Sequence, residues 1–214
     1  MKSTIRFCDD IGMFAYDRSR EQSCIHATAF CKGEYPGSTP CFNAKLERAF
    51  GYTIAPKDVR NDAYWAQLTG PQVKRDLARR RNQTTRVRLM TRGEAFADVT
   101  DVYRVKDILQ HSPATTFWIP TRAWRDKLLR TLIAAEIRPL KNARVLASID
   151  PSNSETEIAS LTANNWSTMF YGDDSATGGR YKCPKTFNHA SGHCAKCVKG
   201  CFSAKRVDVL LKAH

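Results

Sequence analysis

Apolar residues in the middle of the chain follow two alternating patterns. Short apolar runs, of the length of buried strands, lie at residues 87–90, 115–120, 143–149 and 166–171. Two stretches between these runs, residues 99–110 and 124–137, space their apolar residues like the buried face of a helix. Strands that alternate with helices predict βαβ units, and therefore an α/β protein with a mostly parallel sheet.

The regions on either side of this core predict further elements. Residues 56–83 read as two helices, with Pro56 in the first turn of one and Gly70-Pro71 separating it from the next. Residues 205–212 predict a last strand. We expect a single domain built from a cysteine-containing segment, a basic helical pair, the βαβ core, and a cysteine loop with the final strand, at residues 1–55, 56–83, 84–182 and 183–214.

The composition is that of a globular protein. Of the 214 residues, 42% are hydrophobic and 26% are charged, which excludes wholesale disorder. No apolar run is long enough for a transmembrane helix, and the first residues lack the apolar stretch of a signal peptide. We therefore expect a cytoplasmic protein. Disulfides are disfavoured in that compartment, so the eight cysteines predict metal or cluster ligands.

Four cysteines gather near the C-terminus with the spacing C-x(10)-C-x(2)-C-x(3)-C: Cys183, Cys194, Cys197 and Cys201. Proline and glycine punctuate this loop, and it has neither helical nor strand periodicity, so an inorganic centre is expected to hold its shape. Zinc sites usually combine two C-x(2)-C pairs, whereas the loop has one such pair and a Cys-Pro element. This spacing favours a [4Fe–4S] cluster, with zinc as the alternative.

The remaining cysteines lie near the N-terminus: Cys8, Cys24, Cys31 and Cys41. The split into two groups predicts a second four-thiolate site, and thus two [4Fe–4S] clusters in the chain. Cys8 sits in a short apolar run, where a lone cysteine is more often simply buried. His26 is the alternative fourth ligand, because it follows Cys24 by two residues and imidazole also binds metals.

The charge is strongly positive, with 34 Lys and Arg against 21 Asp and Glu and a net charge of +13. Such a balance favours a polyanionic partner, most often nucleic acid. We expect phosphate contacts from the densest basic region: Lys74, Arg75, Arg79, Arg80, Arg81, Arg86 and Arg88. The alternative is a solvated helix end whose arginines complement the helix dipole.

Polar residues follow the predicted strands where each strand ends: Arg92, Arg122, Ser148, Asp150 and Asp173. Ligand sites of parallel α/β folds form at this edge of the sheet, so these residues are candidates for one pocket. The alternative is that strands end in polar residues because loops are solvated. Arg122 could bind a phosphate or carboxylate, or pair with Asp150.

Several motifs resemble the gene product 88 family of phages and plasmids. They are Pro40-Cys41-Phe42-Asn43, the run Phe117-Trp118-Ile119-Pro120-Thr121-Arg122, Ser148-Ile149-Asp150, and the cysteine tail that begins at Cys183-Pro184. The resemblance implies a partial, barrel-like sheet similar to that of radical S-adenosylmethionine proteins, with cysteine clusters at both ends of the chain. It also implies a phage setting, and hence the cytosol of a host cell. Where the first predicted strand ends, the chain has Arg92-Gly93-Glu94 instead of Ser-Gly-Asp, and it lacks the C-x(3)-C-x(2)-C motif of radical enzymes.

Three functions remain open at this point. The leading hypothesis is a nucleic-acid-binding protein whose clusters are mainly structural, because no nucleophile–base pair, phosphate loop or carboxylate dyad stands out. The second is a cluster-containing, radical-SAM-like enzyme acting on a nucleotide or nucleic acid. The third is a zinc-stabilised module that binds a host or phage protein, such as an inhibitor of a host defence factor.

Overall fold

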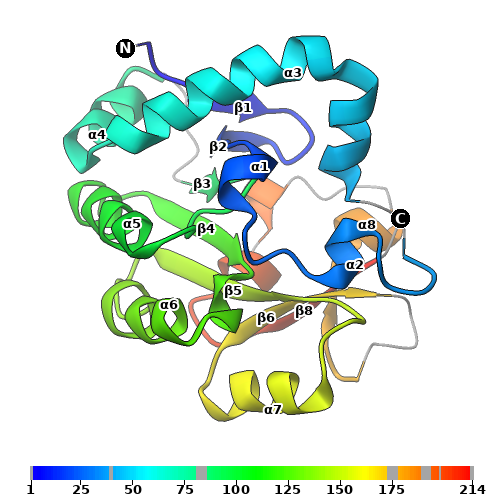
Figure 1. The fold of residues 1–214 in the computed structure, drawn as a ribbon. Coiled ribbons are helices and arrows are strands. Elements are labelled where there is room, and N and C mark those ends of the chain that lie inside the picture. Colours follow the sequence, from blue (N-terminus) through cyan, green and yellow to red (C-terminus); the bar gives the residue numbers. More distant parts are fainter. Residues whose placement is uncertain are drawn as a thin grey trace.

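The computed structural model describes residues 2–38, 41–80, 86–172, 178–188, 194–197 and 199–212. Its centre is an eight-stranded sheet in the order β1-β2-β3-β4-β5-β6-β8-β7 (Figure 1). The strands are β1 (Arg6–Cys8), β2 (Met13–Tyr16), β3 (Arg86–Leu89), β4 (Thr116–Thr121), β5 (Ala143–Ile149), β6 (Ser167–Gly172), β7 (Tyr181–Lys182) and β8 (Asp208–Lys212). Only the β1–β2 pair is antiparallel among these strands, which confirms the predicted α/β class with a mostly parallel sheet.

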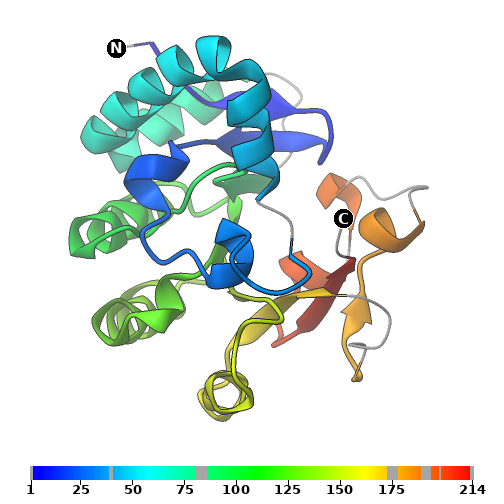
Figure 2. The ribbon, with the colours of Figure 1, turned by 45° about the vertical axis from the view of Figure 1, so that its right-hand side comes forward.

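The helices of the described residues are α1 (Arg20–Ser23), α2 (Ala29–Lys32), α3 (Phe42–Gln67), α4 (Gly70–Ala78), α5 (Val99–His111), α6 (Lys127–Leu132), α7 (Glu155–Ala163) and α8 (Pro184–Asn188). Helices α4 to α7 cover one face of the sheet (Figure 2). From β2 to β6 the strand order follows the chain, so successive right-handed crossovers place their helices on the same side. Figure 2 shows α4, α5, α6 and α7 along that outer side, with the C-terminal segment on the inner side.

Side-chain alternation gives the sheet two cores. On β3, Val87 and Leu89 are fully buried beneath the helices, and Arg86 and Arg88 point to the inner face. On β4, Trp118 likewise points inward. There it packs in a smaller cluster with Ile11, Met13, Leu146, Phe202 and Val209, which we call the inner core. The C-terminal segment therefore covers the inner face of the sheet.

Some predicted elements form as expected, and one predicted helix is divided. The predicted helix at 99–110 is α5, and the predicted strand at 143–149 is β5. The predicted helix at 124–137 is divided into a 3₁₀ turn (Ala123–Arg125), α6 and a π-helical turn (Ile133–Ile137). The first break occurs because the Asp126 side chain caps the start of α6 by accepting from Leu129 N.

The placement of Pro56 in a first helical turn is wrong. The helix α3 begins at Phe42 and contains Pro56, with a break in helical geometry at Phe50. Proline is most favourable in a first helical turn, which is why the sequence indicated a helix start at Pro56, but α3 contains this proline in its interior. The segment α7 was not predicted, although Ser154 and Glu157 form a capping box at its start.

Within the part of the chain that the structure describes, none of the helices combines the length and apolar character needed to cross a membrane.

Candidate functional sites: a cysteine cavity and a basic surface

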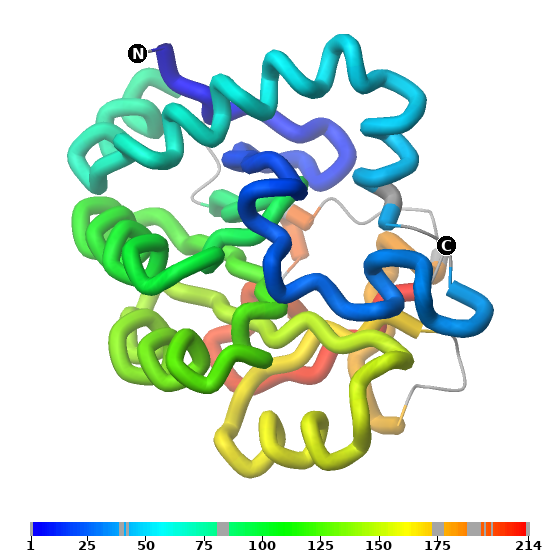
Figure 3. Tube along the Cα trace, in the orientation of Figure 1, coloured from blue at the N-terminus to red at the C-terminus, as the bar shows by residue number. Residues whose placement is uncertain are grey.

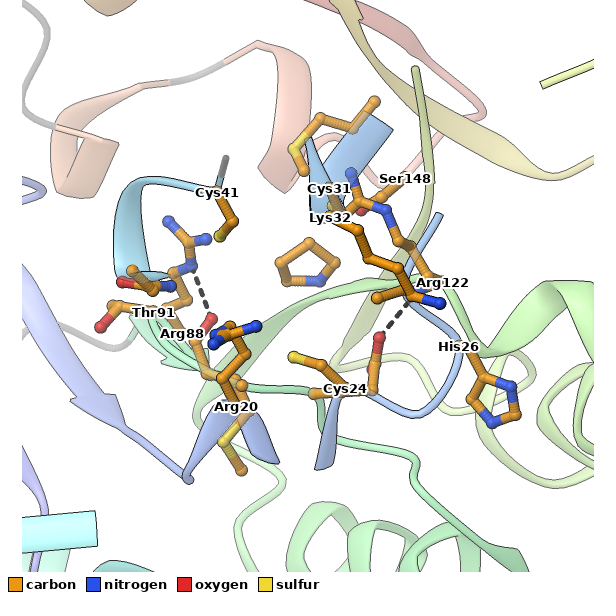
Figure 4. Close-up of a pocket in the computed structure, with 17 residues that line it drawn as sticks. Arg20, Cys24, His26, Cys31, Lys32, Cys41, Arg88, Thr91, Arg122 and Ser148 are labelled. Atoms are coloured by element: carbon orange, nitrogen blue, oxygen red, sulfur yellow. Dashed lines mark hydrogen bonds between the residues drawn. The ribbon is translucent and has the colours of Figure 1, made fainter. Parts of the chain in front are cut away.

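A cavity of about 200 Å³ opens near the carboxyl ends of the parallel strands. Three of the predicted cysteine ligands line it: Cys24, Cys31 and Cys41. Figure 4 shows Cys24 and Cys41 reaching the cavity from different sides. Cys24 follows α1, Cys31 lies within α2, and Cys41 precedes α3, so the turns after β2 bring together thiols that are separated along the chain.

Local hydrogen bonds shape these turns. Ser19 caps α1 by accepting from Gln22 N at 3.1 Å, and Thr28 caps α2 by accepting from Cys31 N at 3.1 Å. The Cys41 amide donates to Cys31 O at 3.1 Å, which places these two cysteines beside each other. Figure 3 traces the resulting blue segment across the front of the sheet.

The same segment is tied to the end of β5. The Thr28 hydroxyl donates to Asp150 Oδ2 at 2.6 Å, and Arg122 Nη2 donates to the same oxygen at 3.2 Å. Burial opposes ionisation of Asp150, but hydrogen bonds from Ser152 and Thr28 and the charge of Arg122 outweigh it and lower the pKa of Asp150. Asp150 is therefore an ionised, fully buried anchor between the cysteine turns and the sheet.

The cavity wall is rich in cations: Arg20, Lys32, Arg88 and Arg122. Arg20 pairs with Glu47 at 2.9 Å. Arg122 pairs with Asp150, but its buried Nε has no hydrogen-bond partner among the described residues. The lining therefore has a positive character that one buried acid, Glu94, offsets only in part.

Glu94 is held by backbone amides. Its Oε1 accepts from Ala95 N at 2.9 Å, and its Oε2 accepts from Arg122 N at 2.8 Å. Burial nevertheless outweighs these hydrogen bonds and raises the pKa of Glu94. Burial likewise raises the pKa of Cys24 to about 12, and the charge of Glu94 adds to this effect. Burial also raises the pKa of Cys31, with a further contribution from Cys41. Neutral thiols are therefore favoured unless a cation binds them.

The predicted pocket forms only in part. Arg122 and Ser148 line the cavity, and Asp150 lies behind them. Arg92 instead pairs with Asp58 and does not line the cavity. Asp173 lies outside the described residues. The sequence did not identify Glu94 and Lys32 as lining residues, although Glu94 lies in the loop that follows β3.

Of the two candidate fourth ligands of the N-terminal group, Cys8 lies elsewhere, whereas His26 lines the cavity. Cys8 packs against the inner core together with Cys183, Cys194 and Cys201. β1 pairs antiparallel with β2 and places Cys8 opposite Met13, at the amino end of β2, whereas Cys24 follows its carboxyl end. The His26 ring in Figure 4 points away from Cys24 and Cys41, and its Nε2 has no hydrogen-bond partner among the described residues.

The C-terminal cysteines gather beneath the inner face. Burial, with the neighbouring charge of Cys183, raises the pKa of Cys194 to about 11, and the charges of Cys183 and Cys194 add to the effect of burial in raising the pKa of Cys201. Arg86 Nη1 donates to Cys197 O at 2.6 Å and so binds this loop to the sheet.

Across the described ranges, no group of His, Cys, Asp or Glu side chains has the arrangement needed to hold a single metal ion.

The predicted basic patch divides between two faces. Lys74, Arg75 and Arg79 are exposed on and just after α4, and Arg80 is half-buried and donates to Ile5 O at 3.3 Å. Arg86 binds the C-terminal loop, and Arg88 lies beneath it with its guanidinium 4.3 Å from the centre of the Trp118 ring. Arg81 lies outside the described residues.

The long helix α3 adds cations that the sequence reasoning did not include: Lys45, Arg48, Lys57 and Arg60. All of them are exposed, and within the described residues none makes an ion pair or a side-chain hydrogen bond. We use the name basic surface for these residues together with Lys74, Arg75 and Arg79.

The acids of α3 and α4 turn toward the protein. Glu47 pairs with Arg20, Asp58 with Arg92, and Asp62 accepts from Ser19 N at 3.0 Å. Asp76 is buried beneath α4, where it accepts from the Tyr64 hydroxyl at 2.6 Å. Charge is thus segregated on the two helices, with ion-paired or hydrogen-bonded acids inside and the cations of the basic surface outside, and α4 lies near the C-terminal end of α3 in Figure 1.

Comparison with known protein families found a match that covers most of the chain. The family model described as gene product 88 matches residues 9–212, a range that includes the cavity, the C-terminal cysteines and both basic helices. No curated protein and no solved structure matches the chain.

Proposed function

The chain belongs to the gene product 88 family, and for this member we propose nucleic-acid binding through the basic surface of α3 and α4. The observation that supports the proposal is the segregation of charge on these helices. Every acid on them has an internal partner, while the exposed cations of the basic surface have no counter-charge within the described residues. Exposed cations without counter-charges repel one another unless an anion binds them, and a phosphate backbone supplies a repeating anion.

An exposed aromatic residue supports the same partner. Tyr52 lies on α3 between Arg48 and Lys57 and is 81% exposed. An aromatic ring among cations is the arrangement on which unpaired bases stack while the cations bind the backbone. Single-stranded nucleic acid is therefore the preferred form of the ligand in this proposal. The cysteine centres of the C-terminal group then act mainly as structural supports for the inner face.

Fluorescence anisotropy with labelled single-stranded and duplex oligonucleotides tests this function. If all cations of the basic surface contact phosphates, the logarithm of the affinity falls with the logarithm of salt concentration with a slope of roughly −5 for single strands. The variant K74Q/R75Q/R79Q should reduce the magnitude of the slope by about 2. The control K127Q/K141Q/K205Q removes the same charge from exposed lysines elsewhere and should leave the slope within about 0.5 of wild type. Equal slopes for the two variants would refute the assignment of this surface.

A second candidate function is a reaction at the cysteine cavity. Two observations favour it: the sequential winding of β2 to β6, which is the winding of a barrel wall, and a cavity at the carboxyl ends of these strands. We propose on this basis that the sheet is a reduced barrel of the radical-SAM-like kind. Turnover assays with R122K and S148A, compared with K127Q on the outer face, test this function. Unchanged turnover in both cavity variants would refute it.

A further inference from the structure

We propose that Cys24, Cys31 and Cys41 hold an iron–sulfur cluster through three protein ligands, and that its remaining iron faces the cavity, where Lys32 and Arg122 bind an anionic ligand. This inference is independent of the nucleic-acid surface, since none of the cavity residues belongs to that surface.

The first observation behind this proposal is that three thiols converge on one cavity. Cys24, Cys31 and Cys41 come from separate turns, yet all line one cavity, and none forms a disulfide. Hydrogen bonds at Thr28 and Cys41 fix these turns to each other and to the end of β5. Grouped and unoxidised thiols in a fixed arrangement are the donor set that binds zinc or iron–sulfur centres.

The second observation is that, among the described residues, no fourth protein ligand is available to the three cysteines. Cys8 lies with the C-terminal group, and His26 lines the cavity but directs its ring away from Cys24 and Cys41 (Figure 4). The carboxylate oxygens of Glu94 accept from backbone amides, and those of Asp150 accept from Thr28, Ser152 and Arg122. One metal position is thus left for a molecule that enters the cavity.

The spread of the thiols distinguishes a cluster from zinc. Thiolates on one zinc ion lie about 3.8 Å apart, because each Zn–S bond is about 2.3 Å and the geometry is tetrahedral. Here the three thiols line a cavity of about 200 Å³, and among the described residues no group of Cys, His, Asp or Glu has the arrangement that a single metal ion needs. A cluster suits this arrangement, because each thiolate binds a different iron and the ligands lie further apart.

Two cations are available for the entering ligand. Lys32 lines the cavity and has no ion pair or hydrogen bond to its amine within the described ranges, and the Arg122 Nε is buried without a partner. The other basic residues of the wall are engaged, Arg20 by Glu47 and Arg88 by the Trp118 ring and Met90 O. A carboxylate or a phosphate group fits a guanidinium and an ammonium presented together.

Anaerobic reconstitution of the full chain with iron and sulfide tests the cluster. Wild type should contain about four more irons and four more sulfides per chain than C24S/C31S/C41S, as expected for loss of one [4Fe–4S] centre. Circular dichroism and the melting curve of the variant show whether it is folded. Zinc without sulfide in wild type, or equal iron content in folded wild type and variant, would overturn the proposal.

Electron paramagnetic resonance of the reduced protein tests the open iron, and this readout does not depend on the triple variant. Cyanide should change part of the wild-type signal, because it binds only an iron that lacks a protein ligand. The control C197S, in the C-terminal group, should keep this response. A wild-type signal that cyanide leaves unchanged, or a response that C197S abolishes, would overturn the assignment.

Inorganic phosphate and acetate are the probes for the anion site, with the same resonance as readout. Either probe should shift the signal in wild type, and K32Q should weaken its binding about tenfold, the usual loss for one charge-assisted hydrogen bond. A preference between the two probes distinguishes a phosphate ligand from a carboxylate ligand. Equal affinity in wild type and K32Q, or no shift with either anion, would overturn the anion site.

Discussion

Replacement of Asp101 by alanine should destabilise the protein strongly and loosen the cysteine turns. Asp101 is 2% exposed on α5, and it joins β2, α3 and α5 at one point. Its Oδ2 accepts from Arg18 Nη1 at 2.6 Å, and its Oδ1 accepts from Trp65 Nε1 at 2.7 Å. Arg18 directly follows β2 and precedes the turns that carry Cys24, so this contact links the sheet to the cavity.

The magnitude follows from what the substitution leaves behind. The Arg18 side chain is only 10% exposed, and its second carboxylate, Asp62, lies 3.9 Å away. Removal of one partner of a buried ion pair costs about 3–5 kcal/mol, and an unsatisfied buried donor such as Trp65 Nε1 costs about 1–3 kcal/mol. Partial relaxation offsets some of this total, so we expect D101A to lower the free energy of unfolding by about 4 kcal/mol.

Urea unfolding followed by far-ultraviolet circular dichroism measures this change. With a slope of about 2.5 kcal/mol per molar urea, the midpoint should fall by about 1.5 M. The control D10A breaks the Asp10–Lys185 pair, in which Asp10 is 75% exposed, and should cost less than about 1 kcal/mol. A loss below about 1 kcal/mol in D101A would show that Arg18 finds another partner or water, and would refute the view that Asp101 holds the cysteine turns.

Three further predictions concern single positions. G93A should lower the free energy of unfolding by about 2 kcal/mol, because Gly93 has φ +79° and a Cβ would lie 2.6 Å from Ser23 Oγ; a midpoint equal to wild type in urea would contradict this. The lowered pKa of Asp150 stabilises the folded state above about pH 4, and this stabilisation is lost as the pH falls through the folded pKa. Below pH 4, the melting temperature of wild type should therefore fall more steeply with pH than that of D150N. Parallel curves of melting temperature against pH for the two proteins would argue against an ionised Asp150. Y52A should weaken binding of single-stranded oligonucleotides by about 1–3 kcal/mol and leave duplex binding unchanged in anisotropy, whereas an equal loss for both would exclude base stacking.

Regular elements with a clear local period could be predicted from the sequence. The runs that became α5 and β5 show their burial pattern within a few turns or residues, because helix and strand place side chains with fixed periods. The short β2 and the capped α7 were missed, since neither has a long apolar pattern. The start of the long α3 was predicted too late, because proline favours a first helical turn and Pro56 therefore indicated a helix start, whereas the folded protein holds Pro56 inside α3.

The candidate sites depended more on the third dimension. The sequence alone identified the residue types of the candidate sites: cysteines in two groups, an excess of cations, and polar residues at strand ends. The tertiary structure decided that Cys8 lies with the C-terminal cysteines, that Arg86 and Arg88 face the inner core, and that α3 carries much of the exposed basic charge. Strand direction and side-chain alternation separate residues that are neighbours in the chain and unite others that are far apart. The face and sheet edge that a residue occupies therefore follow from pairing and packing, which the spacing of residues along the chain does not specify.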